Sequence, residues 1–269
     1  MLYERDYLLG LTEAEKQQYE EVTGRKFGEK RVSGFGRVNN FLAYPKAARM
    51  CKSLFPNNYL DVAELRDAER LAAANEEFFS LLSDEVCTER SILNFIKDKK
   101  YYHIIGSIIW GLSINIGNHG VYLFPEFQLG NSYKADYLLM GKSSGGYEFI
   151  FIELESPYGN ITLKDGQLGA EFRDGISQLE DWKRWLPANY SSFGEVMRKH
   201  KNNALDLPEE FYVLDMSRFH YVVISGRRSD FQDKTYIIKR ERKKADDIDI
   251  IHYDNLYDFS NNLIGKLTY

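Results

Sequence analysis

Cysteine is scarce in this sequence, with only Cys51 and Cys87 in 269 residues and no CxxC spacing. This scarcity argues against both a disulfide framework and a thiolate zinc site. We therefore expect a protein of a reducing cytoplasm.

Long hydrophobic runs are also missing. The longest apolar stretch, residues 103–116, is broken by glycine and polar residues and is too short to span a bilayer. The N-terminal residues, MLYERDYLLGLTEAEKQQ, carry charges within and just after a short apolar stretch, which is not the pattern of a signal peptide. We therefore expect a soluble protein without a membrane partner.

An excess of positive charge is absent as well, because the net charge is −5. This balance argues against a surface coated with basic residues, but a local basic patch would still bind nucleic acid. The hydrophobic content of 43% and the aromatic content of 14% predict a folded chain with a sizeable core. Its length suits one large domain or two modest ones.

The first part of the chain reads as mainly helical. Residues 12–22 predict a short helix, residues 25–58 are irregular, and the apolar spacing of residues 61–82 predicts a long amphipathic helix. Ser83 and Asp84 interrupt that pattern. We place a boundary there, between an accessory region (1–84) with a sensing, regulatory or assembly role and a main domain (85–269).

The main domain has a different pattern of apolar and turn residues. Turn residues at 129–132 and 141–146 separate three apolar runs, which predicts a meander of three strands. The predicted strands are 121–128, 134–140, 147–155, 220–225 and 249–252, and the later helices are 170–185, 191–199, 230–243 and 254–267. This order predicts an α/β fold with a mixed central sheet flanked by helices.

Three acidic residues are expected to meet on this meander. Asp136 lies near the start of the second strand and Glu153 near the end of the third, so an antiparallel hairpin places them opposite each other. Glu155 shares the face of Glu153, because side chains alternate along a strand. A bound Mg²⁺ or Mn²⁺ would offset their repulsion. The simpler alternative is a solvated face of the sheet, although the apolar run 149–152 before Glu153 predicts a buried strand.

The spacing of these acids is similar to the PD-(D/E)xK nuclease signature, and the chain more closely resembles the Shedu anti-phage defence nucleases over about residues 85–269. The similar stretches are ERSILNFI (89–96), FPEFQLGNSYKADYLL (124–139), IELESP (152–157), QLEDW (178–182), VVISGRR (222–228) and HYDNLYDF (252–259). Each stretch alone is weak, whereas their order and spacing are fairly specific.

The resemblance implies a restriction-endonuclease-like fold and a magnesium-dependent DNA endonuclease of the bacterial cytoplasm that assembles as a homo-oligomer. It also implies that Asp136, Glu153 and the backbone carbonyl of Leu154 bind the metal, which Mn²⁺ could replace. Glu89 would contact the metal shell, and Gln178 would reach the site from the helix after the sheet.

One residue departs from the signature, because Glu155 stands where a lysine is usual. Glutamate cannot stabilise an anion, but it accepts a proton from water or holds a second metal. A degenerate nuclease fold that binds nucleic acid or scaffolds a defence complex is therefore the alternative, and a structural Ca²⁺ site is a third. Lys164 is a candidate replacement for the missing charge, with solvated surface as the simpler interpretation. Glu126 either faces the same site or is a surface charge of an edge strand.

The segment 227–244 holds eight basic and three acidic residues, which suits either phosphate binding or a solvated helix face. The residues that we expect to contact DNA are Arg227, Arg228, Lys239, Arg240, Arg242, Lys243 and Lys244. Trp182 and Trp185 lie at helical spacing, and we expect them to pack in the core rather than to stack on bases. The five histidines show no spacing typical of metal ligands.

Overall fold

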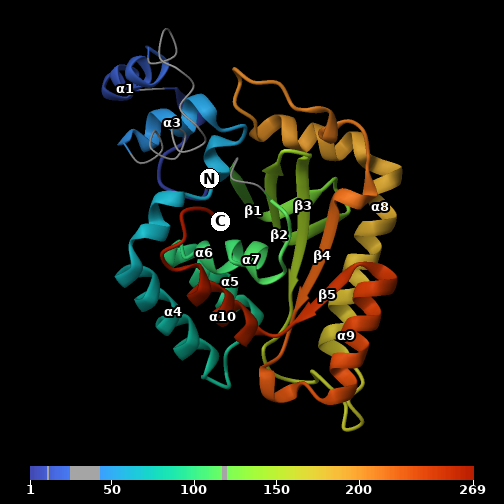
Figure 1. Ribbon diagram of the computed structural model, residues 1–269. Helices are drawn as coiled ribbons and strands as arrows, with labels where there is room; N and C mark the ends of the chain where they lie inside the picture. Colours follow the sequence, from blue (N-terminus) through green and yellow to red (C-terminus); the bar gives the residue numbers. More distant parts are fainter. Residues whose placement is uncertain (11, 25–42, 117–119) are drawn as a thin grey trace.

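The computed structural model describes residues 1–10, 12–24, 43–116 and 120–269. The described residues form an open, mixed sheet of five strands. Helices lie on both sides of this sheet (Figure 1), which confirms the predicted fold class. None of the helices in these residues is long and apolar enough to cross a membrane.

The sheet consists of β1 (Val121–Leu129), β2 (Tyr133–Ser143), β3 (Gly146–Leu154), β4 (Phe219–Ile224) and β5 (Ile248–Ile251), which are neighbours in this order. β1, β2 and β3 pair antiparallel, which confirms the predicted meander, and β4 and β5 add parallel to β3. The predicted six-residue loop at 141–146 is wrong, because the ladder continues to the pair Ser143–Gly146. The strands extend because only two residues, the second of them a glycine, are needed to turn the chain.

The interior of the sheet is the centre of the core. Phe149 and Phe151 are fully buried in β3 and stack on Phe219 in β4, at 4.8 and 6.1 Å between ring centroids. On this face Trp182 lies 5.9 Å from Phe151, so its predicted packing role is confirmed. Ile150, on the opposite face of β3, is also fully buried. β3 is therefore covered on both sides, as its continuous apolar run predicts.

Helices cover the two faces unequally. α8 (Ala170–His200) and α9 (Asp233–Asp246) connect the parallel strands and lie on one side of the sheet, in the right half of Figure 1. α5 (Glu89–Lys99), α6 (His103–Gly106), α7 (Ile108–Gly111) and α10 (Tyr253–Leu263) lie on the other side. The carboxyl ends of β3, β4 and β5 therefore open at one edge between these two layers.

α8 corrects the prediction of two separate helices at 170–185 and 191–199. The helix is continuous to His200 but kinked at Asn189, whose φ of −132° and ψ of 25° are not helical. Pro187 lacks the amide hydrogen that an unbroken helix would use, which explains a kink at this point.

Several other boundaries differ from the prediction. α3 (Pro45–Lys52) lies within the region predicted to be irregular, because Pro45 occupies the first turn of the helix, where proline is tolerated. α4 (Ala68–Leu82) begins later than residue 61, since the Asp67 side chain accepts from the Arg70 amide as an N-cap. α10 ends at Leu263 instead of residue 267. The prediction for residues 25–42 lies outside the described residues.

The N-terminal region packs directly on the main domain. α1 (Glu13–Gly24) agrees with the predicted helix, and α4 lies against α10. Apolar residues from both regions, such as Phe78 and Leu256, belong to one continuous core. A functional division at residue 84 stays a prediction.

Candidate functional site

Asp136 and Glu153 meet where β2 and β3 reach the edge of the sheet. The last pair of the ladder is Tyr137–Ile152, so the next opposed positions are Asp136 and Glu153. The Leu154 amide donates to Asp136 Oδ2 at 2.8 Å, which fixes the Asp136 carboxylate against β3. The strand register alone therefore brings two carboxylates together from positions 17 residues apart in the sequence.

Glu155 lies just beyond the end of β3 and is held by contacts to its backbone. Its amide donates to the carbonyl of Ile224 at 2.8 Å, and the Tyr253 hydroxyl donates to its carbonyl at 2.7 Å. The side chain faces α8, where Gln178 Nε2 donates to its Oε1 at 3.3 Å. A Cβ atom on Gly175 would lie 3.0 Å from that same oxygen. The glycine therefore lets α8 approach Glu155 closely.

Burial and mutual repulsion make these carboxylates hold their protons more tightly. Glu153 is 6% exposed and Glu155 is 9% exposed. Burial, reinforced by neighbouring acids, raises the pKa of Asp136 to about 7, that of Glu153 to about 9 and that of Glu155 to about 8. The Oε2 atom of Glu153 is buried without a hydrogen-bond partner among the described residues. Such an arrangement is costly unless a cation joins it.

Further acids contribute to the same electrostatic cluster. Glu89, at the start of α5, raises the pKa of Asp136, Glu153 and Glu155, so the structure brings it to the predicted site. Glu171 and Asp174, in the first turns of α8, also raise the pKa of Glu155, and neither was predicted as a site residue. Their spacing with Gln178 along one helix face was the available signal.

Two cations lie near the acids. Arg90 and Lys134 both lower the pKa of Asp136, against the stronger effect of burial. Lys134 is engaged elsewhere, because its Nζ lies 2.8 Å from Glu126 Oε1. Arg90 is exposed and makes no ion pair with the described residues. It therefore remains available to a negatively charged ligand.

The structure also places the two accessory candidates. Glu126 is 43% exposed and pairs with Lys134 and, at 3.9 Å, with Lys97, which favours its interpretation as a surface charge. Lys164 is exposed in the loop between β3 and α8, and it contacts none of the acids described above.

The donor set fits a small hard cation held by two carboxylates. No group of three or more His, Cys, Asp or Glu residues in the described parts of the chain is arranged to hold a metal ion. Mg²⁺ usually needs only one or two carboxylates and completes its shell with water and substrate phosphates. The opposed Asp136 and Glu153, with the unpartnered oxygen of Glu153, satisfy that requirement. The Leu154 carbonyl as a third ligand stays a prediction.

Most of the predicted DNA-contacting residues are paired within the protein. Arg227 donates to both carboxylate oxygens of Asp254, at 2.8 and 3.1 Å, and Arg228 pairs with Asp258. Arg242 lies 3.2 Å from Glu180 and 2.9 Å from Asp246.

The remaining residues predicted to contact DNA include both paired and unpaired side chains. Burial lowers the pKa of Lys239. Lys243 is held by acids at the start of β5, whereas Arg240 and Lys244 are exposed without ion pairs among the described residues. The positive charge open to a ligand is therefore much smaller than the sequence count indicates.

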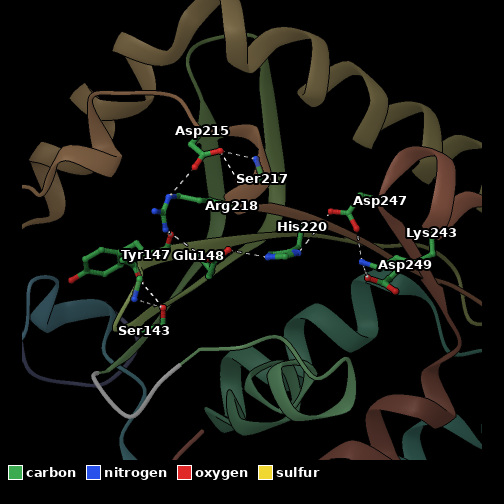
Figure 2. A network of polar contacts seen from close by, with 12 residues as sticks. Ser143, Tyr147, Glu148, Asp215, Ser217, Arg218, His220, Lys243, Asp247 and Asp249 are labelled. Carbon is green, nitrogen blue, oxygen red and sulfur yellow. Dashed lines mark hydrogen bonds and ion pairs between the residues drawn. The ribbon is translucent and has the colours of Figure 1, made fainter.

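Lys243 belongs to a separate polar network at the opposite edge of the sheet (Figure 2). His220 Nε2 lies 3.1 Å from Glu148 Oε2, and Arg218 lies 3.6 Å from the other oxygen of Glu148. Lys243 lies 2.9 Å from Asp249. Because positive and negative groups alternate there, the network stabilises the amino ends of β3 to β5. His220 therefore has a structural role in this network.

The chain was compared with known protein families. Residues 87–257 match the profile of a family described as Shedu protein SduA, C-terminal. The matched range begins just before α5 and ends within α10, so it contains the whole sheet and every carboxylate of the site. A search of the curated proteins gives no match.

Proposed function

Because this chain belongs to the family of Shedu protein SduA, C-terminal, which suggests a part in anti-phage defence, we propose that it is a metal-dependent DNA endonuclease. The observation that carries the proposal is the pair of opposed, largely buried carboxylates Asp136 and Glu153, since one oxygen of Glu153 has no hydrogen-bond partner in the described parts of the chain. The wider arrangement of acids near a three-stranded meander and α8 agrees with a PD-(D/E)xK nuclease of restriction-endonuclease-like fold.

Each residue of the site has a distinct proposed role. Asp136, Glu153 and the Leu154 carbonyl hold Mg²⁺, or Mn²⁺ in its place, and the ion supplies the positive charge that stabilises a phosphate under attack. Glu155 accepts a proton from the attacking water. Gln178 and Tyr253 fix the position of Glu155 through their hydrogen bonds to its side chain and carbonyl. Glu89 holds water molecules at the entrance of the site.

Cleavage of DNA tests the proposal directly. We expect the protein to cut linear or circular DNA with Mg²⁺ or Mn²⁺, and we expect the Asp136→Asn/Glu153→Gln variant to lose at least a hundredfold of that rate. Both substitutions keep the shape of the side chains and remove only the charge. Equal rates for the two proteins would remove these residues from the active site.

The same experiment separates the second candidate function. Glu155 in place of the usual lysine favours a degenerate nuclease that binds nucleic acid or scaffolds a defence complex. Retained DNA binding without cleavage under any divalent ion would support that candidate. We further propose that residues 1–84 regulate or assemble the protein and that it forms homo-oligomers, which sedimentation of the full chain would test.

A further inference from the structure

A cleft lies between the edge strand β1, the kinked part of α8 and the N-terminal residues Met1, Asn57 and Asn58. Its volume is about 890 Å³, within the range of small-molecule sites. Its walls include Phe124, Gln128, Trp185, Asn189, Ser192 and His200. It is separate from the carboxylates, which none of its lining residues supplies, but Phe127 in its wall pairs with Ala135, the neighbour of Asp136.

The edge of β1 in this cleft is poorly suited to pairing with another strand. Pro125 has no amide hydrogen, and Glu126 has a φ of 49°, which takes its backbone out of the extended conformation. The ladder to β2 accordingly skips the position of Glu126. Proline, charge and irregular backbone protect sheet edges from strand addition. The occupant is therefore not an extended peptide.

The walls offer flat aromatic surface. Trp185 is half-buried, and one side of its indole covers the turn at Gly130, where a Cβ would lie 2.7 Å from Cζ2. His200 packs edge-on against Phe124 at 5.4 Å between ring centroids. Burial lowers the pKa of His200, so the ring is neutral and offers one donor and one acceptor. The expected packing of Trp185 in the core thus describes only one side of the ring.

The walls also offer unused hydrogen-bonding groups. The side chain of Gln128 is exposed, and its carboxamide forms no hydrogen bond with the described parts of the chain. Asn189 Nδ2 donates to the Trp185 carbonyl at 2.9 Å, which leaves its Oδ1 as an acceptor towards the cleft. Carboxamides present donors and acceptors side by side, the pattern that reads the edge of a nucleobase.

The charges of the walls balance. Glu126 and Glu195 line the cleft together with Lys199 and the amino group of Met1. Because the walls carry no net positive charge, a phosphate would gain little here. Aromatic rings, carboxamides and a neutral imidazole without net positive charge together fit a planar molecule with several donors and acceptors.

We propose that this cleft binds a nucleobase, presented either by a free nucleoside or by an unpaired nucleotide of a nucleic-acid strand. Trp185 stacks on the base, and Gln128 and Asn189 bond to its edge. The proposal goes beyond the endonuclease function and stands whether or not the carboxylates cut DNA. Stacking on a single base is a weak interaction, so the expected affinity for a nucleoside alone is modest.

Titration of the full-length protein with the four deoxynucleosides tests this inference. We expect saturable quenching of tryptophan fluorescence by at least one nucleoside, and we expect Trp185→Phe to abolish the quenching. Gln128→Leu changes an exposed side chain and should weaken binding at least fivefold, whereas Gln167→Leu, an exposed glutamine in a distant loop, should leave it unchanged. The Asp136→Asn/Glu153→Gln variant should bind as the wild type does.

Two further ligands distinguish the sources of the base. A duplex with one unpaired terminal nucleotide should bind more tightly than the same duplex with an abasic terminus if the base comes from a strand. Equal binding of these duplexes, together with saturable binding of a nucleoside, assigns the cleft to free nucleosides. Absence of quenching by every nucleoside and both duplexes, or binding unaffected by Gln128→Leu and Trp185→Phe, would overturn the proposal.

Discussion

At the scale of one residue, Glu153 of the candidate site is expected to lower the stability of the fold. Its carboxyl group is buried beside Asp136 and Glu155, and burial with their repulsion raises its pKa to about 9. Glutamine has nearly the same shape without the charge. We expect Glu153→Gln to increase the free energy of unfolding by about 1–3 kcal/mol at pH 8 without divalent ions, measured by urea denaturation.

A matched substitution on the same strand supplies the control. Glu148 also lies in β3, but it is paired with Arg218 and His220. Glu148→Gln removes attraction instead of repulsion, so it should lower the stability or leave it unchanged. If the two variants changed the stability in the same direction, Glu153 would not be under electrostatic stress.

Arg90 is our candidate for the positive charge that Glu155 does not supply. It lowers the pKa of both Glu89 and Asp136, and it has no ion-pair partner among the described residues. We expect Arg90→Ala to reduce the cleavage rate about tenfold, because the charge that faces the phosphate is lost. Single-turnover cleavage with saturating protein measures this step without a contribution from DNA affinity.

Two controls accompany Arg90→Ala. One is a conservative substitution of Arg90 itself, and the other removes a different cation of α5. Arg90→Lys keeps the charge and should restore most of the rate. Lys97→Ala removes an exposed cation of α5 that pairs with Glu126, and it should leave the rate unchanged. A loss of rate in Lys97→Ala equal to that of Arg90→Ala would indicate a general effect of charge on α5.

Single residues also show how much of the candidate site the sequence predicts. The alternation of side chains and the hairpin register were sufficient to bring Asp136, Glu153 and Glu155 together. Glu171, Asp174 and Tyr253 escaped prediction because they reach the cluster through the packing of α8 and α10 on the sheet. The spacing along α8 places Glu171 and Asp174 on the helix face of Gln178, but it does not tell which part of the sheet that face contacts, whereas strand alternation is local.

At the scale of elements, the fold was predictable where hydrophobic periodicity is strong and turn residues clearly separate the segments. The meander and both parallel strands follow from alternating or continuous apolar runs. The helices α3 and α8 were predicted wrongly because proline is compatible with more than one local structure. Pro45 begins α3 and Pro187 kinks α8, and both residues suggest an interruption from sequence alone.

α9 allows a prediction about DNA binding that the sequence could not refine. Of its basic residues, Arg240 and Lys244 are exposed and unpaired within the described structure, whereas Arg242 is paired with Glu180 and Asp246. We expect Arg240→Glu/Lys244→Glu to reduce the slope of log affinity against log salt by about 1–2. Fluorescence anisotropy of labelled duplex DNA over a salt series measures the slope.

Arg242→Gln is the comparison for α9. Its guanidinium already neutralises two acids, so its loss should change the slope by less than half of the effect of the double variant. An unchanged slope in Arg240→Glu/Lys244→Glu would show that α9 is solvated surface that does not contact DNA. A large effect of Arg242→Gln alone would mean that its ion pairs break when DNA binds.

At the scale of the whole molecule, acids and ion pairs are distributed to opposite edges of one sheet. The carboxyl edge holds the clustered acidic residues of the candidate site. The amino edge holds the alternating charges of Figure 2, which favour the fold. The repulsion among the acids at one edge is thus offset by attraction at the other and by the continuous core between them.

Glu64 joins distant parts of the chain and makes their association sensitive to pH. Its carboxyl group is buried, and the hydroxyls of Tyr3 and Tyr269 donate to it, while Arg70 lies 3.6 Å away. Burial outweighs these partners and raises its pKa to about 7 from 4.5. The protonated form therefore favours the folded protein, and its contribution to stability is complete only below the unfolded pKa.

As the pH rises from about 4.5 through about 7, that contribution is lost, since the unfolded chain ionises first. We expect wild type to lose up to about 3 kcal/mol relative to Glu64→Gln over this range. Urea denaturation of both proteins in buffers between about pH 5 and pH 8 gives the difference, in which all other titrating groups cancel. A difference independent of pH, or one that favours wild type at higher pH, would show that Arg70 and the tyrosines hold Glu64 ionised in the fold.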